Sequence, residues 1–392
     1  MAAAAKIDAV LRRAVEAGDV PGVVATAATD RGTFYEGAFG QRDIAGGSAM
    51  TCDTIFRIAS MTKAVTSVAA MQLVEAGKLD LDRPIGGVMP ELAAPHVLAG
   101  FDVTGKPRLR PARRPITLRH LLTHTAGFGY EMLNSELIRY IHRTDTPSIS
   151  TGKLASLRLP LLFDPGERWQ YGINIDWVGL AVEAASGKTL DVYFREHIFD
   201  PLGMTNTEFA PTPEQTSRLV RVHKRETDGS LEPIVLDSPP ANPEFWAGGG
   251  GLYSTGRDYL TFLRMVLGQG RFDGARLLRP ETVAAMASNQ TGDLEAGVMR
   301  TAMPERTNDF ALFPGMRCHW GLGWMITPQP GPNGRSPGSL TWGGIFNSYY
   351  WIDPIERVAG VIMTQFLPFA DPRALALSGA FERAVYDVLQ SD

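Results

Sequence analysis

The chain contains little cysteine: Cys52 and Cys318 are its two cysteines in 392 residues. Two cysteines exclude a disulfide framework and favour a reduced, cytoplasmic setting. Long hydrophobic runs are also missing, because no stretch of about 18 apolar residues occurs, and this argues against a membrane-spanning helix. The first residues lack a basic segment followed by an apolar one, so we expect no secretory signal.

The chain also lacks a large excess of either positive or negative charge. The chain has 38 Lys and Arg against 42 Asp and Glu, a net charge of −4, with no long run of either sign. This balance argues against a protein that binds nucleic acid or a polybasic membrane-surface protein. What the chain does have is 44% hydrophobic and 20% charged residues, an ordinary globular composition. Its length allows a large core and either several domains or one domain with an insertion.

The two ends of the chain carry strand patterns, whereas the middle does not. Residues 100–115 within that middle are basic and rich in proline, and we expect a surface loop there. The pattern predicts an α+β fold in which residues 1–78 and 214–392 form an antiparallel sheet flanked by the terminal helices, and residues 79–213 form a mainly helical inserted domain. The elements expected at the two ends are helices at 5–16, 60–76 and 372–389 and strands at 23–29, 33–39, 320–327, 339–343, 348–353 and 357–364.

One helix start carries an unusual charge. Ser60-Met61-Thr62-Lys63 opens a helix with no other charged residue before Glu75, and a helix that is apolar nearly all round is buried. The helix dipole disfavours a lysine in the first turn. Ser60 and Lys63 are three apart and share one helix face, so a buried amine could activate the hydroxyl as a nucleophile. The alternative is a serine N-cap followed by a lysine that reaches solvent.

Further motifs follow in a recognisable order. They are LRHLLTHTAGF at 118–128, DPGERWQYG at 164–172, GGGGLYST at 248–255 and WGG at 342–344. Together with Ser60-Met61-Thr62-Lys63 they resemble the serine β-lactamase and D,D-peptidase superfamily, and within it most closely the family VIII carboxylesterases, which are similar to class C β-lactamases. The resemblance spans residues 20–364 and implies a β-lactamase-like fold.

The resemblance also implies three catalytic roles. Ser60 would be the acylated nucleophile, Lys63 its hydrogen-bonded partner that holds a positive field, and Tyr171 the general base that later protonates the leaving group. A phenol has a pKa of about 10 and is a poor base at neutral pH. The nearby cation is therefore a chemical requirement of this assignment. The alternative for Tyr171 is an aromatic anchor in the turn that follows Pro165.

Trp342-Gly343-Gly344 stands where the lactamases carry Lys-Thr-Gly. In the family this strand lines the site, and the N–H of Ile345 would pair with that of Ser60 as an oxyanion hole. Glycines fit this role because they let a substrate approach the backbone. We also predict that Phe128 and Tyr130 line an acyl pocket, although buried aromatic residues are more often plain core.

Two departures from the lactamase pattern bear on the substrate. Trp342 replaces the lysine that would engage a substrate carboxylate, and Ile173 replaces the asparagine expected two residues after the tyrosine, with Asn174 one position off. Both changes remove groups that bind an anionic, amide-bearing substrate, and they leave an apolar wall suited to a neutral ester. The sequence therefore predicts a carboxylesterase that prefers short-chain esters of small molecules and uses no cofactor.

Other functions stay open. A β-lactamase or D-amino-acid peptidase, or slow β-lactam turnover beside esterase activity, is compatible with the motifs, as is an acyltransferase that uses the same acyl-enzyme. A binding module that is acylated and never turns over is a fourth alternative. His120 and His124 are four apart, as zinc ligands on a helix are, but Leu121 stands where the zinc-protease motif needs glutamate, so we predict no metal site.

Overall fold

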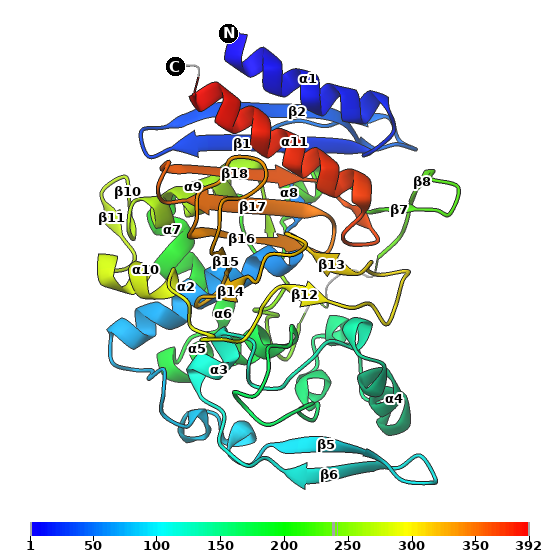
Figure 1. Ribbon diagram of the computed structural model, residues 1–392, viewed down its shortest axis with the longest axis vertical. Helices are drawn as coiled ribbons and strands as arrows, with labels where there is room; N and C mark the ends of the chain where they lie inside the picture. The colour runs from blue at the N-terminus through cyan, green and yellow to red at the C-terminus, as the bar shows by residue number, and fades with distance from the viewer. Residues whose placement is uncertain (1, 237–239, 241, 391–392) are drawn as a thin grey trace.

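The computed structural model describes residues 2–236, 240 and 242–390. At its centre lies an eight-stranded antiparallel sheet (Figure 1). The strand order is β14-β15-β16-β17-β18-β1-β2-β3. Strands from the two chain ends meet where β18 pairs with β1, with Val24 opposite Met363. The predicted antiparallel sheet is thereby confirmed. Its strands are β1 Gly22–Thr29, β2 Thr33–Asp43, β3 Ser48–Ala49, β14 His319–Trp320, β15 Met325–Thr327, β16 Ser339–Gly344, β17 Ser348–Asp353 and β18 Val358–Met363.

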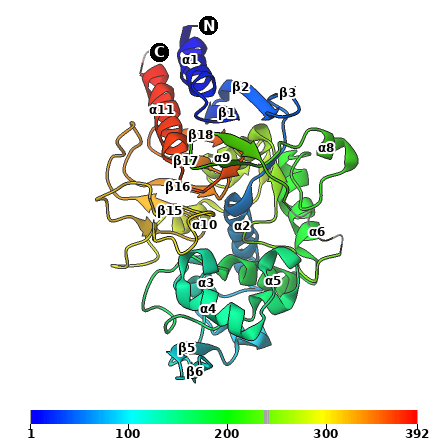
Figure 2. The ribbon, with the colours of Figure 1, turned by 90° about the vertical axis from the view of Figure 1, so that its right-hand side faces the viewer.

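Helices cover both faces of the sheet. The terminal helices α1 (Ala2–Glu16) and α11 (Pro372–Leu389) pack against each other on one face, and α2 (Thr62–Glu75) and α9 (Gly256–Leu267) lie on the other (Figure 2). The central strands β16, β17 and β18 are buried along their whole length, as expected for strands covered on both sides. This arrangement confirms the prediction that the terminal helices flank the sheet.

Helix α2 is buried on nearly every side, as its apolar sequence predicts. Its start differs from the prediction, however. Ser60 lies in a 3-10 turn, Ala59–Met61, and the α-helix begins only at Thr62. The reason is local backbone geometry: Ala59 has a left-handed φ of 45°, so the chain turns sharply before it enters the helix.

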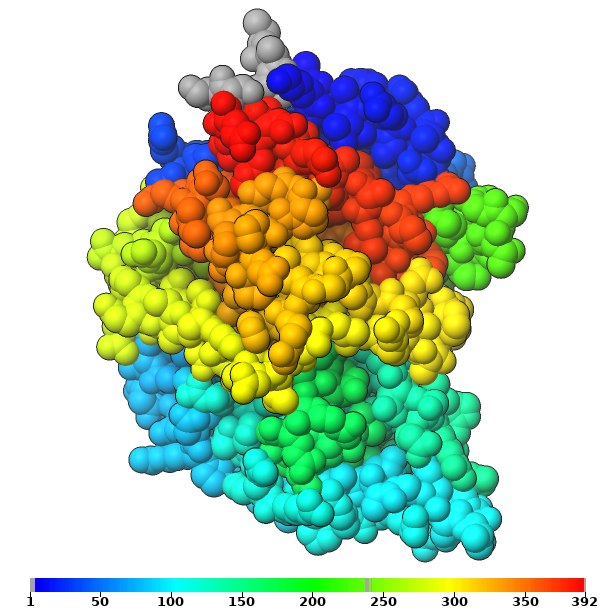
Figure 3. Space-filling model, viewed as in Figure 1, coloured from blue at the N-terminus to red at the C-terminus, as the bar shows by residue number. Residues whose placement is uncertain are grey.

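The middle of the chain is mostly helical and lies at the end of the molecule away from the two termini (Figure 3). Its main helices are α3 (Leu118–Leu122), α4 (Ser135–Thr144), α5 (Asn174–Ser186) and α6 (Leu190–Phe194). The domain boundaries near residues 79 and 213 stay a prediction.

The prediction of a loop at residues 100–115 is wrong. β5 (His96–Phe101) and β6 (Pro107–Pro111) form a hairpin. The Asp102 carboxylate accepts hydrogen bonds from the N–H groups of Thr104 and Lys106 and fixes the turn between the strands. Prolines at both ends of β6 hide the strand pattern, because proline is compatible with an edge strand but is not typical of one.

Among the residues that the structure describes, no helix combines the length and apolar character required to cross a membrane.

Shorter elements connect the strands and helices named above. These elements are β4 Phe56–Arg57, β7 His223–Arg225, β8 Leu231–Pro233, β9 Tyr253–Ser254, β10 Arg271–Phe272, β11 Ala275–Arg276, β12 Val298–Met299, β13 Phe310–Ala311, β19 Phe366–Leu367, the π-helix Arg195–Phe199, α7 Asp200–Leu202, α8 Pro213–Ser217 and α10 Pro280–Met286.

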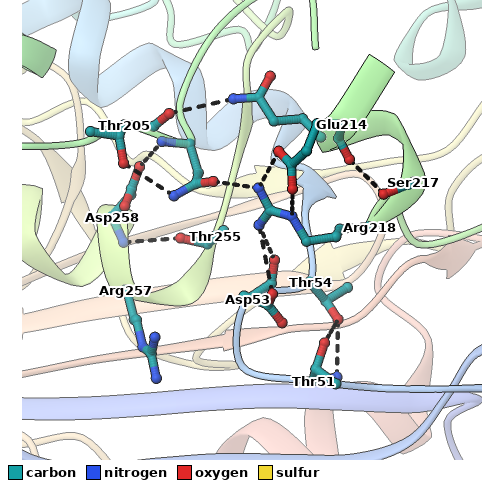
Figure 4. Close-up of polar contacts among 12 residues, drawn as sticks. Thr51, Asp53, Thr54, Thr205, Glu214, Ser217, Arg218, Thr255, Arg257 and Asp258 are labelled. Atoms are coloured by element: carbon teal, nitrogen blue, oxygen red, sulfur yellow. Dashed lines mark hydrogen bonds and ion pairs between the residues drawn. The ribbon is translucent and has the colours of Figure 1, made fainter. Parts of the chain in front are cut away.

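A polar network anchors the segment that leads to Ser60 (Figure 4). The Arg218 guanidinium, just after α8, donates to the carbonyl of Asp53 at 2.8 Å and to the Glu214 carboxylate at 2.9 Å. The N–H of Ile55 donates to the carbonyl of Arg218 at 3.0 Å. Charge-assisted hydrogen bonds are stronger than neutral ones, so this network fixes the path of the chain shortly before Ser60.

Candidate active site

Lys63 stands at the centre of the candidate site. Its side chain lies in the first turn of α2 and is 1% exposed. The Nζ atom donates to Ser60 Oγ at 3.3 Å, to Tyr130 Oη at 3.1 Å and to the Gly249 carbonyl at 2.5 Å. An ammonium group has three N–H donors and no acceptor. The three oxygens match the three donors of the ammonium group. Its positive charge therefore lies beside the Ser60 hydroxyl.

The turn that carries Ser60 is held on both sides by one residue. The N–H of Ile58 donates to the carbonyl of Leu252 at 3.0 Å, and the N–H of Leu252 donates to the Thr62 hydroxyl at 3.1 Å. The left-handed φ of Ala59 lies between these contacts. A non-glycine residue keeps such a conformation only where its surroundings impose it. The hydrogen bonds therefore fix the direction in which the Ser60 side chain points.

Tyr171 lies close to the same lysine. Its side chain is 4% exposed, and Lys63 Nζ is 4.7 Å from the centre of its ring. The phenol oxygen accepts a hydrogen bond from Trp342 Nε1 at 2.9 Å. The structure thus brings Ser60, Lys63 and Tyr171 into one cluster, although they come from a 3-10 turn, a helix and a loop before α5.

Two motifs that are far apart in the sequence meet to build this cluster. A Cβ at Gly172 would lie 2.4 Å from the carbonyl oxygen of Phe128, so the two loops touch backbone to backbone. This contact requires glycine. It brings Tyr130 and Tyr171 side by side, with ring centroids 5.5 Å apart.

Tyr130 contacts the lysine directly, which the sequence did not predict. Burial, together with the nearby Asp176 carboxyl, raises the pKa of Tyr130 well above its ordinary value. The Tyr130 phenol is therefore protonated at neutral pH. Asp176 accepts a hydrogen bond from the N–H of Gly249 at 2.9 Å, and in this way it holds the glycine whose carbonyl oxygen accepts from Lys63.

His124 and Asn174 hold the loop that leads from His124 to Phe128, next to the candidate site. His124 is fully buried, and burial together with the Lys63 charge holds the pKa of His124 well below its usual range, so its ring is neutral. Asn174 Nδ2 lies 3.0 Å from His124 Nδ1 and donates to the carbonyl of Phe128 at 3.3 Å. Among the residues that the structure describes, no group of three or more His, Cys, Asp or Glu side chains is placed to hold a metal ion.

The end of β16 lies against the turn that carries Ser60. A Cβ at Gly344 would be 2.5 Å from the carbonyl oxygen of Ile58, and a Cβ at Gly343 would be 2.8 Å from the carbonyl oxygen of Ser348. Side chains at these positions would collide with backbone. Gly344 thus lets the backbone that continues into Ile345 approach the Ser60 turn, as the predicted oxyanion hole requires, whereas Gly343 makes room for the neighbouring strand β17.

Trp342 and Phe128, which the sequence predicts as a substrate-facing wall and pocket lining, are buried among other aromatic side chains, and their contact with a substrate stays a prediction. Trp342 is 3% exposed, and its ring packs edge to face against Trp320 at 4.7 Å and Phe310 at 5.9 Å. Phe128 is 2% exposed and stacks on Trp177 at 6.1 Å. The contacts of Phe128 are those of a core residue. The indole N–H of Trp342 donates to the phenol oxygen of Tyr171.

Sequence reasoning missed the parts played by Gly249 and Asp176. The sequence marks the glycine run at 248–251 as part of a motif, but does not show that a carbonyl oxygen within it accepts from Lys63. Asp176 sits in the first turn of α5, where an acidic residue is expected on helix-dipole grounds alone. Its contact with Gly249 becomes visible only in three dimensions.

Two known proteins are similar to this chain over nearly its whole length. Monacolin J acid methylbutanoyltransferase of Aspergillus terreus is 35% identical over 395 residues, which cover 97% of this chain and 95% of that protein. Lovastatin esterase of Penicillium rubens is 32% identical over 393 residues, which cover 97% of this chain and 98% of that protein.

A solved structure supports the fold. A simvastatin synthase mutant from Aspergillus terreus superposes with a TM-score of 0.86 at 33% identity, covering 100% of this chain and 98% of that one. The predicted β-lactamase-like fold is therefore confirmed. The sequence profile of the family described as Beta-lactamase matches residues 7–383. Because this match spans nearly the whole chain, the protein belongs to the beta-lactamase family.

Proposed function

We propose that this protein is a serine hydrolase that cleaves carboxylic esters through an acyl-enzyme on Ser60, with a preference for short acyl chains and with the family VIII carboxylesterases as its nearest class. One observation carries the proposal: Lys63 Nζ lies 3.3 Å from Ser60 Oγ and 4.7 Å from the centre of the Tyr171 ring. A nucleophile, a cation and a phenol within one buried cluster are the groups that this chemistry needs.

The proposed reaction has two halves. Tyr171, as a phenolate favoured by the Lys63 ammonium, takes the Ser60 proton while Oγ attacks the ester carbonyl. The N–H groups of Ser60 and Ile345 donate to the developing oxyanion, and Tyr171 then protonates the leaving alcohol. In the second half, water attacks the acyl-enzyme and gives a proton to Tyr171. The bond between Ser60 Oγ and the acyl carbon then breaks, Tyr171 passes the proton to Oγ, and the acid leaves.

Acyl transfer to an alcohol is the second candidate function. A methylbutanoyltransferase at 35% identity and an esterase at 32% identity both align over 97% of this chain. The two activities differ only in whether an alcohol or water attacks the acyl-enzyme. Turnover of β-lactams or D-amino-acid peptides is a lesser alternative, because the residue in place of the lactamase lysine is Trp342, a neutral side chain that is 3% exposed.

Product analysis with purified protein tests the proposal. We expect hydrolysis of short-chain nitrophenyl esters, a new ester when a small alcohol is added if transfer operates, and a loss of roughly a thousandfold or more in Ser60→Ala. Ser67→Ala is the matched control, since Ser67 lies in α2, the helix that follows the Ser60 turn, and its buried hydroxyl has no hydrogen-bond partner among the described residues. A chromogenic cephalosporin turned over more efficiently than the esters would contradict the proposal.

A further inference from the structure

The phenol oxygen of Tyr171 has a fixed neutral donor. Trp342 Nε1 lies 2.9 Å from Tyr171 Oη within buried surroundings. An indole N–H donates and never accepts. The phenol oxygen is therefore the acceptor in this contact, and a lone pair on it faces a donor before any proton is transferred.

We propose that Trp342 is a positioning residue that holds the oxygen of Tyr171 and stabilises its phenolate form through the indole N–H. The inference rests on the proposed function, in which Tyr171 is the base. It changes the part assigned to Trp342 from an apolar wall to a hydrogen-bond donor that acts through Tyr171.

The indole is locked in place, which makes it a precise donor. Trp342 is 3% exposed and meets Trp320 edge to face at 81° and Phe310 at 88°. Its backbone lies in β16, where it pairs with Tyr350 of β17. A hydrogen bond in such a dry environment is stronger than one exposed to water. The ring therefore sets where the phenol oxygen sits as well as how readily it carries charge.

Lys63 does not supply this donor. Its Nζ already faces the oxygens of Ser60, Tyr130 and Gly249, and it meets Tyr171 over the ring face instead of at the oxygen. A second buried cation at the phenol oxygen would add a large desolvation cost. A neutral tryptophan provides the N–H without that cost.

Three titratable groups near Tyr171 keep one state at neutral pH. His124 is neutral because burial and Lys63 hold its pKa well below the usual range. Burial raises the pKa of both Tyr130 and Tyr350, so both phenols are protonated. The Asp176 carboxyl, whose pKa burial raises from its ordinary value, faces Tyr130 and the Gly249 turn.

The test is the pH profile of kcat/KM for a nitrophenyl ester in Trp342→Phe. Loss of the donor destabilises the phenolate, so we expect the acid limb to move up by about one pH unit, which lowers kcat/KM about tenfold at each pH on that limb. Trp320→Phe is the matched control. Trp320 belongs to the same aromatic cluster, but its indole donates to the carbonyl of Leu122 at 3.1 Å, so its acid limb should not move.

A double variant separates this role from packing. If Trp342 acts through Tyr171, then Trp342→Phe causes little further loss in a Tyr171→Phe background. If Trp342→Phe does not fold, as judged by circular dichroism, benzothienylalanine at position 342 keeps the ring shape without the N–H and takes its place. An acid limb that stays at the wild-type pH in a folded variant would overturn the inference.

The outcome also separates the inference from the proposed function. Ester turnover that survives Ser60→Ala would overturn the proposed function itself. Turnover that depends on Ser60, combined with an unshifted acid limb in Trp342→Phe, would overturn only the role of Trp342.

Discussion

At the scale of single residues, a buried ammonium organises the site. Lys63 is 1% exposed and meets three oxygens, one of which belongs to Ser60. A buried charge is tolerated only where its donors are matched, and its desolvation is costly even then; here the donors are matched by groups of the candidate site. The same residue therefore has a stability cost and a proposed chemical role, and the two can be separated by mutation.

Lys63→Met tests that separation. Methionine has a similar length and carries no charge, so we expect kcat/KM for a nitrophenyl ester to fall roughly a thousandfold. The melting temperature should stay the same or rise, because an apolar side chain removes the desolvation cost. Lys78→Met, at an exposed position after α2, is the control and should change neither quantity. A variant with wild-type activity would contradict the role of Lys63.

Tyr130 and Tyr171 can be distinguished in the same assay. Because burial and Asp176 raise the pKa of Tyr130 well above its ordinary value, this phenol is protonated and does not act as a base. We expect Tyr130→Phe to lower kcat/KM about tenfold through the lost contact with Lys63, and Tyr171→Phe to lower it roughly a thousandfold. A larger loss in Tyr130→Phe than in Tyr171→Phe would show that the base has been assigned to the wrong tyrosine.

At the scale of elements, close backbone contacts position the groups. The end of β16 lies against the 3-10 turn of Ser60, and the loop before α5 lies against residues 128–129, with glycine at each contact. The sequence motifs mark these glycines, because a side chain at either place would meet backbone atoms. The elements that carry the candidate site are thus held by packing that tolerates no added methyl group.

Gly344→Ala tests the contact between β16 and the Ser60 turn. The new Cβ would lie 2.5 Å from the carbonyl oxygen of Ile58, a backbone atom that cannot rotate away. We expect kcat/KM to fall by at least about tenfold, since a small displacement of catalytic groups has a large effect on rate. Gly87→Ala is the control, because a Cβ there meets nothing within 4 Å. Equal activities for the two variants would argue against the contact.

The loop that carries Tyr171 has a pH-dependent anchor. Asp164 accepts from the Arg110 guanidinium at 3.0 and 2.7 Å and from the N–H of Arg113 at 2.8 Å. The Arg110 guanidinium beside it lowers the pKa of Asp164 to about 2. Because this value is below that of the unfolded chain, the interaction stabilises the fold above about pH 4, and the stabilisation is lost as the pH falls towards 2.

Urea unfolding of Asp164→Asn between pH 2 and pH 7 measures this effect. We expect a lower free energy of unfolding at pH 7 than in the wild type and a shallower decline between pH 4 and pH 2. Glu305→Gln, at an exposed carboxyl, should follow the wild-type curve. If Asp164→Asn declined as steeply as the wild type, the ion pair would not be the source of the pH dependence.

At the scale of the whole molecule, the sequence predicted most of the architecture. The helices expected at the two ends of the chain and the strand patterns beside them were sufficient to predict a sheet flanked by the terminal helices. The β5–β6 hairpin was missed because its prolines and basic residues are typical of a loop. The start of α2 was misplaced because a left-handed Ala59 has no sequence signature, unlike a glycine.

The candidate site was predicted in part. Motif order was sufficient to pick out Ser60, Lys63 and Tyr171, which the structure places in one cluster, and their catalytic roles stay a proposal. The contacts of Tyr130 with Lys63 and of Trp342 with Tyr171 were not predictable. They depend on rings from separate segments packing together, and a single sequence does not encode such a contact as a local pattern.

Mass spectrometry of the acylated protein tests the central claim most directly. The whole protein is treated with a fluorophosphonate or a slowly hydrolysed ester, its intact mass is measured, and the adduct is located by digestion. The account predicts one adduct on the peptide that contains Ser60, absent in Ser60→Ala and formed much more slowly in Lys63→Met. An adduct on another residue, or ester turnover that continues without any adduct on Ser60, would contradict it.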